Sequence, residues 1–162
     1  MIHTGSSRIA VELGSLIIKL PRLDLDALIY QVQCAYFMRY NKKNISFFFE
    51  VILKSLLKRF LTGMRDNKNE YQYCHETSTD YVAPCVFCLF GIISICKYAG
   101  PIGVSIDEFR ALKQRLFPGD NSHTLNPDNF GIYNNKIVCR DYAYLPHDTI
   151  THYVTKLREA LI

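Results

Sequence analysis

Short runs of β-forming and apolar residues recur along the chain and predict three antiparallel hairpins. The paired runs are residues 8–13 with 16–20, 85–90 with 92–97, and 130–133 with 136–142. Gly14 and Gly91 stand in the first two turns. The third turn holds Asn134 and Asn135, which tolerate the positive φ that such turns require. Pro21 is expected to end the first hairpin, since proline cannot donate to a strand ladder.

Between these hairpins the apolar residues follow helical spacing. Gly63 is expected to interrupt the longest helical stretch, and the helix after it is more polar. Ser105 and Glu108 have the spacing of a capping box, which predicts a helix start. The expected helices are two within 24–61, broken near 41–44, and single helices at 64–77, 105–116 and 148–162. Antiparallel hairpins alternating with helices predict an α+β fold.

Length and composition bound the kind of protein. With 162 residues, the chain is expected to form one domain, 1–162, that buries about 70% of its unfolded surface. It is 49% hydrophobic, and we assign the excess to the strand pair at 85–97 and to aromatic residues of 24–61. The apolar run 82–96 is shorter than the roughly 20 residues of a membrane-spanning helix, so no membrane span is expected.

The N-terminus and the cysteines indicate a reducing compartment. The first residues lack the basic and apolar regions of a secretory signal, which predicts a cytoplasmic protein. The six cysteines are therefore expected to be reduced, most of them as small core residues. Cys85 and Cys88, with Cys74 and His75 upstream, are not expected to bind zinc, because strand residues three apart face opposite sides.

Positive charge is concentrated in one segment. The formal net charge is +4, yet residues 39–65 hold seven basic residues against Glu50 as the one acid. A solvated helix face, an anionic protein, nucleic acid and anionic lipid all fit such a pattern. The aromatic residues of the same segment favour a protein partner, with Lys54, Lys58 and Arg59 as the contact residues. A nucleic-acid role is disfavoured because the pI is near 8.7.

Several polar residues stand in an informative order around these elements. A Gly5-Ser6 turn leads into the hairpin that carries Lys19, a helix then carries Glu70, and Asn129 and Asp141 bracket the last hairpin. In this order they resemble the protein-kinase-like fold. Small proteins of this kind, with Asn-Phe-Gly in the catalytic loop and Asp-Tyr after it, occur among bacteriophages and prophages. The resemblance implies a minimal kinase-like domain with residues 24–61 as a helical insertion.

The resemblance also implies a role for each matched residue. Lys19 corresponds to the strand lysine that contacts phosphates, and Glu70 to its helix partner, with Glu76 less favoured. Tyr98 lies in a segment similar to the hinge at which adenine docks. The implied cofactors are ATP and magnesium. The implied nucleotide-binding residues are Gly5, Ser6, Lys19, Glu70 and Tyr98, and the implied metal ligands are Asn129 and Asp141.

Two departures from the kinase pattern weaken the expectation of catalysis. Thr124 stands where the family has its catalytic aspartate, and a threonine hydroxyl cannot accept a proton near neutral pH. Asp128, or else Asp120, is the alternative base. Only 21 residues follow Asp141, which predicts a reduced C-terminal lobe without the usual surface for a protein substrate.

These observations leave three functional hypotheses. The leading one is a pseudokinase that binds a host or viral protein and inhibits or regulates it. The second is an active small phosphotransferase that uses Mg-ATP. The third is an inhibitor that acts by binding alone, through the basic helical insertion. Oligomeric state is not predicted by the sequence.

Overall fold

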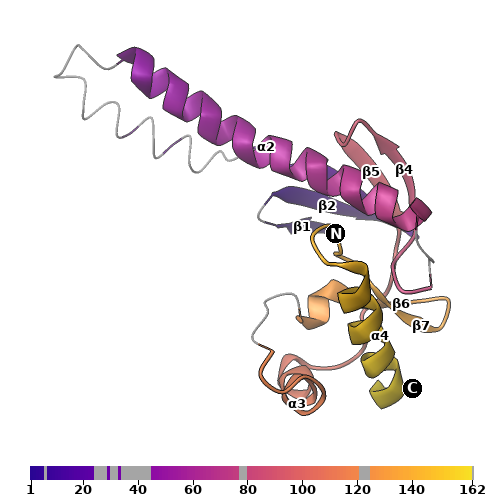
Figure 1. The fold of residues 1–162 in the computed structure, drawn as a ribbon. Coiled ribbons are helices and arrows are strands. Elements are labelled where there is room, and N and C mark those ends of the chain that lie inside the picture. The colour runs from indigo at the N-terminus through magenta and orange to yellow at the C-terminus, as the bar shows by residue number, and fades with distance from the viewer. Residues whose placement is uncertain are drawn as a thin grey trace.

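The computed structural model describes residues 1–5, 7–23, 29, 33, 45–76, 80–120 and 125–161. Its fold is α+β (Figure 1). Five antiparallel strands form one sheet in the order β1-β2-β3-β5-β4, and a separate hairpin, β6-β7, lies below it. The strands of the sheet are β1 (Ile2–Thr4), β2 (Arg8–Leu13), β3 (Leu16–Pro21), β4 (Cys85–Leu89) and β5 (Ile93–Lys97). The other elements are α2 (Ile45–Glu76), α3 (Ile106–Leu116), η1 (Pro127–Asn129), β6 (Phe130–Tyr133), β7 (Lys136–Cys139) and α4 (His147–Leu161).

All three predicted hairpins are present. Gly14 has a positive φ in the β2–β3 turn, and β3 ends at Pro21 as expected. Asn134 and Asn135 both have positive φ in the β6–β7 turn. The last strand is shorter than the predicted 136–142, since β7 ends at Cys139. Residues 140 and 141 leave the hairpin because they bond to side chains of the upper sheet.

The predicted interruption at Gly63 is wrong. α2 runs without a break from Ile45 to Glu76, so the second half of the expected insertion is continuous with the helix that carries Glu70. Gly63 is buried, and a Cβ built there would lie 2.4 Å from the Ser7 carbonyl oxygen. This glycine therefore allows the helix to approach the β-sheet closely instead of ending the helix. The helix expected between 24 and 41 lies outside the described residues.

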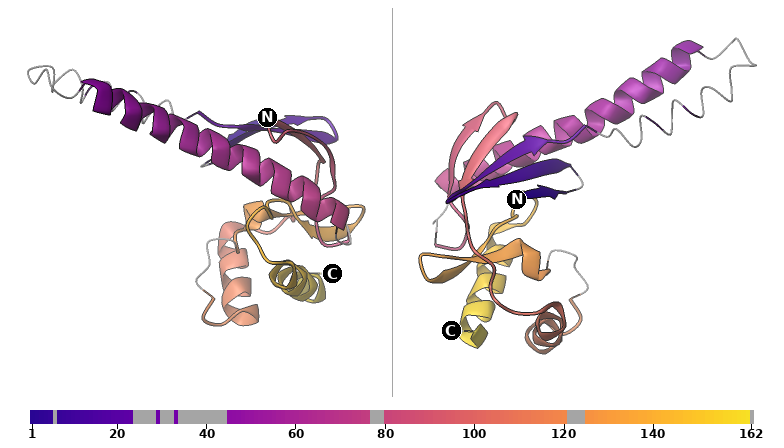
Figure 2. Two further views of the ribbon diagram at one scale, coloured as in Figure 1. Left: turned by 45° about the horizontal axis from the view of Figure 1, so that its top comes forward. Right: turned by 180° about the vertical axis from the view of Figure 1, so that it is seen from behind.

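The expectation of two buried strands at 85–97 is half correct. β5 is an inner strand that alternates between half-buried and buried residues, whereas β4 is an edge strand with exposed Val86, Phe87 and Leu89. α2 lies across one face of the sheet (Figure 2). A row of apolar residues at paired positions crosses all five strands on the opposite face. Its members are Ile2, Val11, Ile18, Ile95 and Phe87. Part of the excess hydrophobicity therefore lies on this outer sheet face and not in the core.

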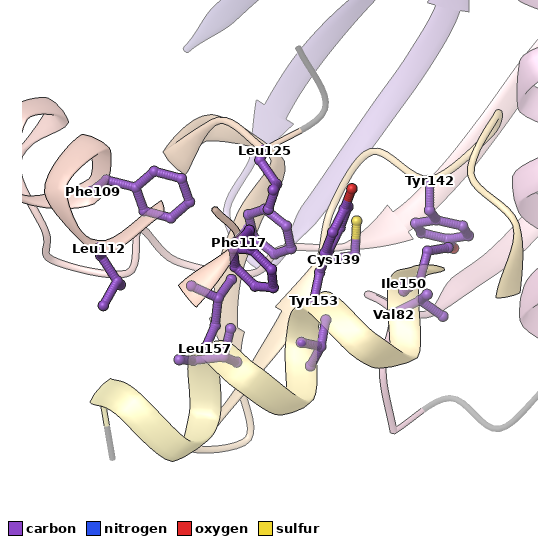
Figure 3. Close-up of a cluster of buried hydrophobic side chains, with 13 residues drawn as sticks. Val82, Phe109, Leu112, Phe117, Leu125, Cys139, Tyr142, Ile150, Tyr153 and Leu157 are labelled. Atoms are coloured by element: carbon purple, nitrogen blue, oxygen red, sulfur yellow. The ribbon is translucent and has the colours of Figure 1, made fainter. Parts of the chain in front are cut away.

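The lower half of the molecule has its own core. Figure 3 shows aromatic and aliphatic side chains from α3, β6-β7 and α4 packed together. Phe130, Ile150 and Val154 are fully buried there, and the Tyr142 hydroxyl donates a 2.8 Å hydrogen bond to the Ala83 carbonyl. The α3 capping box is present, with Ser105 N donating to Glu108 Oε2 at 2.9 Å. These contacts fix the polypeptide just before and after Asp141.

Cysteines and membrane segments can be compared directly with expectation. Cys74, Cys85, Cys96 and Cys139 are free and buried, as predicted for small core residues, and Cys88 is free and half-buried. Among the helices of the described residues, none is long and apolar enough to cross a membrane.

Candidate functional site

The predicted pairing of Lys19 with Glu70 is present. Lys19 points from β3 toward α2, and its Nζ donates to Glu70 Oε2 at 2.7 Å and to the Arg140 carbonyl at 3.0 Å. Burial alone would lower the pKa of Lys19, but the surrounding negative charges, chiefly the Glu70 carboxylate with a smaller effect of Asp141, together raise the pKa above its ordinary value. Glu76, the less favoured partner, is the exposed last residue of α2. The lysine is therefore charged and held by two elements besides its own strand.

Arg8 completes this cluster, although the sequence analysis did not identify it. Its guanidinium lies 2.9 Å from Glu70 Oε1 and also bonds Asp141 Oδ1. Arg8 and Lys19 share one face of the sheet because Ala10 pairs with Lys19, two residues further along β2. Two cations at neighbouring positions on one face are a signal that acids must lie opposite. That signal was available in the sequence once the hairpin register was known.

Asp141 connects the lower hairpin to the sheet. It follows β7, and about half of its side chain is exposed beside the buried Arg8. Partial burial would raise the pKa of Asp141, yet the charges of Arg8 and Lys19 outweigh it and hold the pKa below its ordinary value. Asn129 lies close by along the backbone, since its carbonyl accepts a 2.7 Å hydrogen bond from Arg140 N. The structure thus gathers four of the predicted site residues: Lys19, Glu70, Asn129 and Asp141.

A polar stripe on α2 positions Glu70. Asp66, Asn67 and Glu70 are each fully buried on the side of the helix that faces the sheet. Asp66 Oδ2 accepts a 2.7 Å hydrogen bond from Ser7 Oγ. Asn67 Nδ2 donates to the carbonyls of Lys19 and Gly91 at 3.2 and 2.8 Å. These hydrogen bonds fix the rotation of α2 about its own axis and its position along β3. The Glu70 carboxylate therefore faces the Lys19 ammonium group.

The other predicted site residues that the structure describes lie in turns and connecting segments or on η1. Gly5 lies in the turn between β1 and β2, where its N–H donates to the Arg8 carbonyl at 2.8 Å. Tyr98 is half-buried after β5, and its N–H donates to the Ser15 carbonyl. Asp128 is exposed on η1. Asp120 Oδ2 accepts a 2.5 Å hydrogen bond from the Tyr153 hydroxyl. Ser6 and Thr124 lie outside the described residues.

The predicted partner-binding residues form a separate surface. Lys54, Lys58 and Arg59 are exposed on the N-terminal half of α2, which extends well beyond the sheet (Figures 1 and 2). Lys58 precedes Glu70 by twelve residues, which is about 18 Å along a helix axis. Exposed leucines share this half of the helix, namely Leu53, Leu57 and Leu61. This surface, here called the projecting helix surface, is therefore both basic and apolar.

The carboxylates of the cluster do not fit a divalent metal ion. Glu70 is bonded by Lys19 and Arg8, and Asp141 Oδ1 by Arg8. Across the residues that the structure describes, no three His, Cys, Asp or Glu side chains are grouped so that they could hold a metal ion. The expected ligands Asn129 and Asp141 are thus brought near each other by the backbone bond between Arg140 and Asn129, but Asp141 is already bonded by a cation.

A hollow of about 550 Å³ opens elsewhere, between the end of α3 and the start of α4. It is lined by residues that include Phe117, Asp120 and Asp148, and by no member of the Lys19 cluster. The cluster, and not this hollow, therefore contains the chemistry that the sequence predicts.

Comparison with known proteins adds no further assignment. No family model, curated protein or solved structure matches this chain.

Proposed function

We propose that this protein is a kinase-like nucleotide-binding pseudokinase that regulates a host or viral protein by binding it. The observation that carries the proposal is the buried Lys19–Glu70 ion pair between β3 and α2, with Asp141 beside it. The sheet order β1-β2-β3-β5-β4 with a helix between β3 and β4 supports the same proposal, since it sets the glutamate helix against the lysine strand.

Burying the Lys19–Glu70 ion pair costs hydration free energy, and this cost favours a functional role for the pair. A lysine and a glutamate lose their hydration when buried, and apolar residues of similar volume often stabilise a fold as well or better. Glu70 is nevertheless fully buried and Lys19 nearly so. Charged groups whose pKa values are perturbed by specific partners are concentrated at functional sites.

Lys19 retains the capacity to bind a phosphate oxygen. Its ammonium group has three N–H donors, and two of them are used by Glu70 and the Arg140 carbonyl. In the proposed site the third donates to a phosphate of ATP, as the kinase resemblance implies. Binding without transfer is favoured because a threonine at position 124 cannot act as a base and Asp120 is bonded to Tyr153, so transfer would require the exposed Asp128 as the base.

Replacing Lys19 with alanine is expected to abolish ATP binding. Calorimetric titration of the wild type with ATP and magnesium should give a dissociation constant of about micromolar, and Lys19→Ala should raise it at least about 100-fold. Lys136→Ala is the matched control, because Lys136 is an exposed strand lysine paired with Asp80.

Absence of ATP binding by folded wild-type protein would remove the nucleotide site from the proposal. Robust phosphorylation of a partner, abolished by Asp141→Ala, would instead support the second hypothesis, an active phosphotransferase. Circular dichroism on each variant separates loss of binding from loss of fold.

Reversing the charges of the projecting helix surface is expected to abolish partner binding and to leave ATP affinity unchanged. Lys54, Lys58 and Arg59 are exposed and about 16 Å or more along the helix from Glu70, so their charges can contact a protein without touching the cluster. The change to glutamate at all three positions is checked by co-purification from host lysate and by ATP calorimetry. Reversal of Arg110, Arg115 and Lys136, which are exposed elsewhere, is the control of equal charge. Partner capture that survives the first reversal would exclude this surface.

A further inference from the structure

We infer that Arg8 takes the place of a divalent metal ion, so that the site binds its nucleotide without magnesium. This inference rests on the proposed nucleotide site and concerns how that site balances its charges. The kinase resemblance implies Asn129 and Asp141 as metal ligands, whereas in the structure Asp141 is bonded by Arg8.

Arg8 bridges two carboxylates of the cluster. Its buried guanidinium spans two acidic side chains, lying 2.9 Å from Glu70 Oε1 and bonding Asp141 Oδ1. A guanidinium stays protonated at any physiological pH, so Arg8 cannot leave these carboxylates by losing its charge. Asp141 therefore has a permanent cation beside one of its two carboxylate oxygens, which repels a metal ion that approaches the same carboxylate.

The cluster has a net negative formal charge. Three carboxylates lie along it, those of Asp66, Glu70 and Asp141, and Asp66 is bonded by Ser7. Against them stand Lys19 and Arg8, so the sum of the five formal charges is −1. Without Arg8 the sum would be −2, which is the balance that a divalent cation neutralises. Magnesium also requires nearly octahedral oxygen ligands, which bonded carboxylates cannot supply.

In the inferred site Arg8 donates hydrogen bonds to phosphate oxygens. An arginine side chain has five N–H donors in a fixed fork, and phosphate oxygens accept such donors readily. Arg8 begins β2, three residues after Gly5, in the segment that the kinase resemblance places over the phosphates. Arg8 and Lys19 together supply two positive charges where a kinase supplies one lysine and a metal ion.

Titration of ATP in magnesium buffer and in EDTA buffer tests this inference. For the wild type, the two dissociation constants are expected to agree within about twofold. Arg8→Met should bind ATP at least about tenfold more weakly in EDTA than in magnesium, because it restores the negative charge of the cluster. Arg8→Lys keeps the charge but not the fork, so its affinity should fall while its two dissociation constants still agree within about twofold.

A second measurement uses the metal alone. Manganese titration followed by electron paramagnetic resonance, without nucleotide, should show no bound Mn²⁺ in the wild type and a new site in Arg8→Met. Wild-type binding that is tenfold weaker in EDTA, or Mn²⁺ bound by the wild type, would overturn the inference while leaving the nucleotide site intact. Failure of the wild type to bind ATP in either buffer would contradict the proposed function itself, and the manganese result would still decide whether the cluster excludes metal. If Arg8→Met does not fold, the two wild-type measurements decide.

Discussion

Replacing Glu70 with alanine is expected to destabilise the protein by about 3–5 kcal/mol, which is a large part of the stability of a domain of this size. Glu70 is fully buried, and its two oxygens face Lys19 at 2.7 Å and Arg8 at 2.9 Å. Its removal leaves two cations beside each other, one with only Asp141 and the other with only a carbonyl. Urea unfolding followed by circular dichroism measures the loss.

The matched control is Glu159→Ala. Glu159 is also a helix glutamate paired with a lysine, but it is exposed and its partner lies 3.5 Å away, so its removal should cost less than about 1 kcal/mol. The double variant Lys19→Met/Glu70→Leu should recover part of the Glu70→Ala loss, because one of the two uncompensated cations is gone. If Glu70→Ala were no more harmful than Glu159→Ala, the buried cluster would not exist in solution.

The sequence predicted those parts of the fold that local chemistry decides. The β6–β7 turn was predicted from two adjacent asparagines, and the start of α3 from the Ser105–Glu108 capping box. Both depend on residues within a few positions of each other. The Lys19–Glu70 pair spans 51 residues and was predicted from the order of motifs, not from their spacing.

Contacts between distant residues that the kinase resemblance does not include were not predicted. Arg8 resembled an ordinary charged residue at a strand start, because its partners lie 62 and 133 positions away. The predicted break at Gly63 was wrong because the sequence pattern of α2 is unusual. Its buried stripe is polar, with Asp66 and Asn67 facing the sheet, whereas Leu53 and Leu57 are exposed. Because apolar residues usually mark the buried face of a helix, the polar residues after Gly63 were interpreted as a separate helix, although Asp66 and Asn67 are the residues that this part of α2 buries.

Replacing Gly63 with alanine is expected to destabilise the protein by about 1–3 kcal/mol, although alanine is the better helix former by about 1 kcal/mol. A Cβ at this position would lie 2.4 Å from the Ser7 carbonyl oxygen and 2.9 Å from Pro21 Cα, both of them backbone atoms that cannot move aside cheaply. α2 must then shift away from β2 and β3. Thermal unfolding of the variant measures the loss.

The same shift should reach the candidate site, because Gly63 lies two turns before Glu70 on the face of α2 that packs against the sheet. Ser7 both approaches Gly63 and bonds Asp66, so displacement of the helix lengthens the bonds that direct Glu70 at Lys19. ATP affinity should therefore fall together with stability in Gly63→Ala. Gly100→Ala is the control, since nothing lies within 4 Å of a Cβ there, and its stability should change by less than about 0.5 kcal/mol. Equal stability of the two variants would show that α2 does not pack this closely on the strands, and the rigid placement of Glu70 would lose its physical basis.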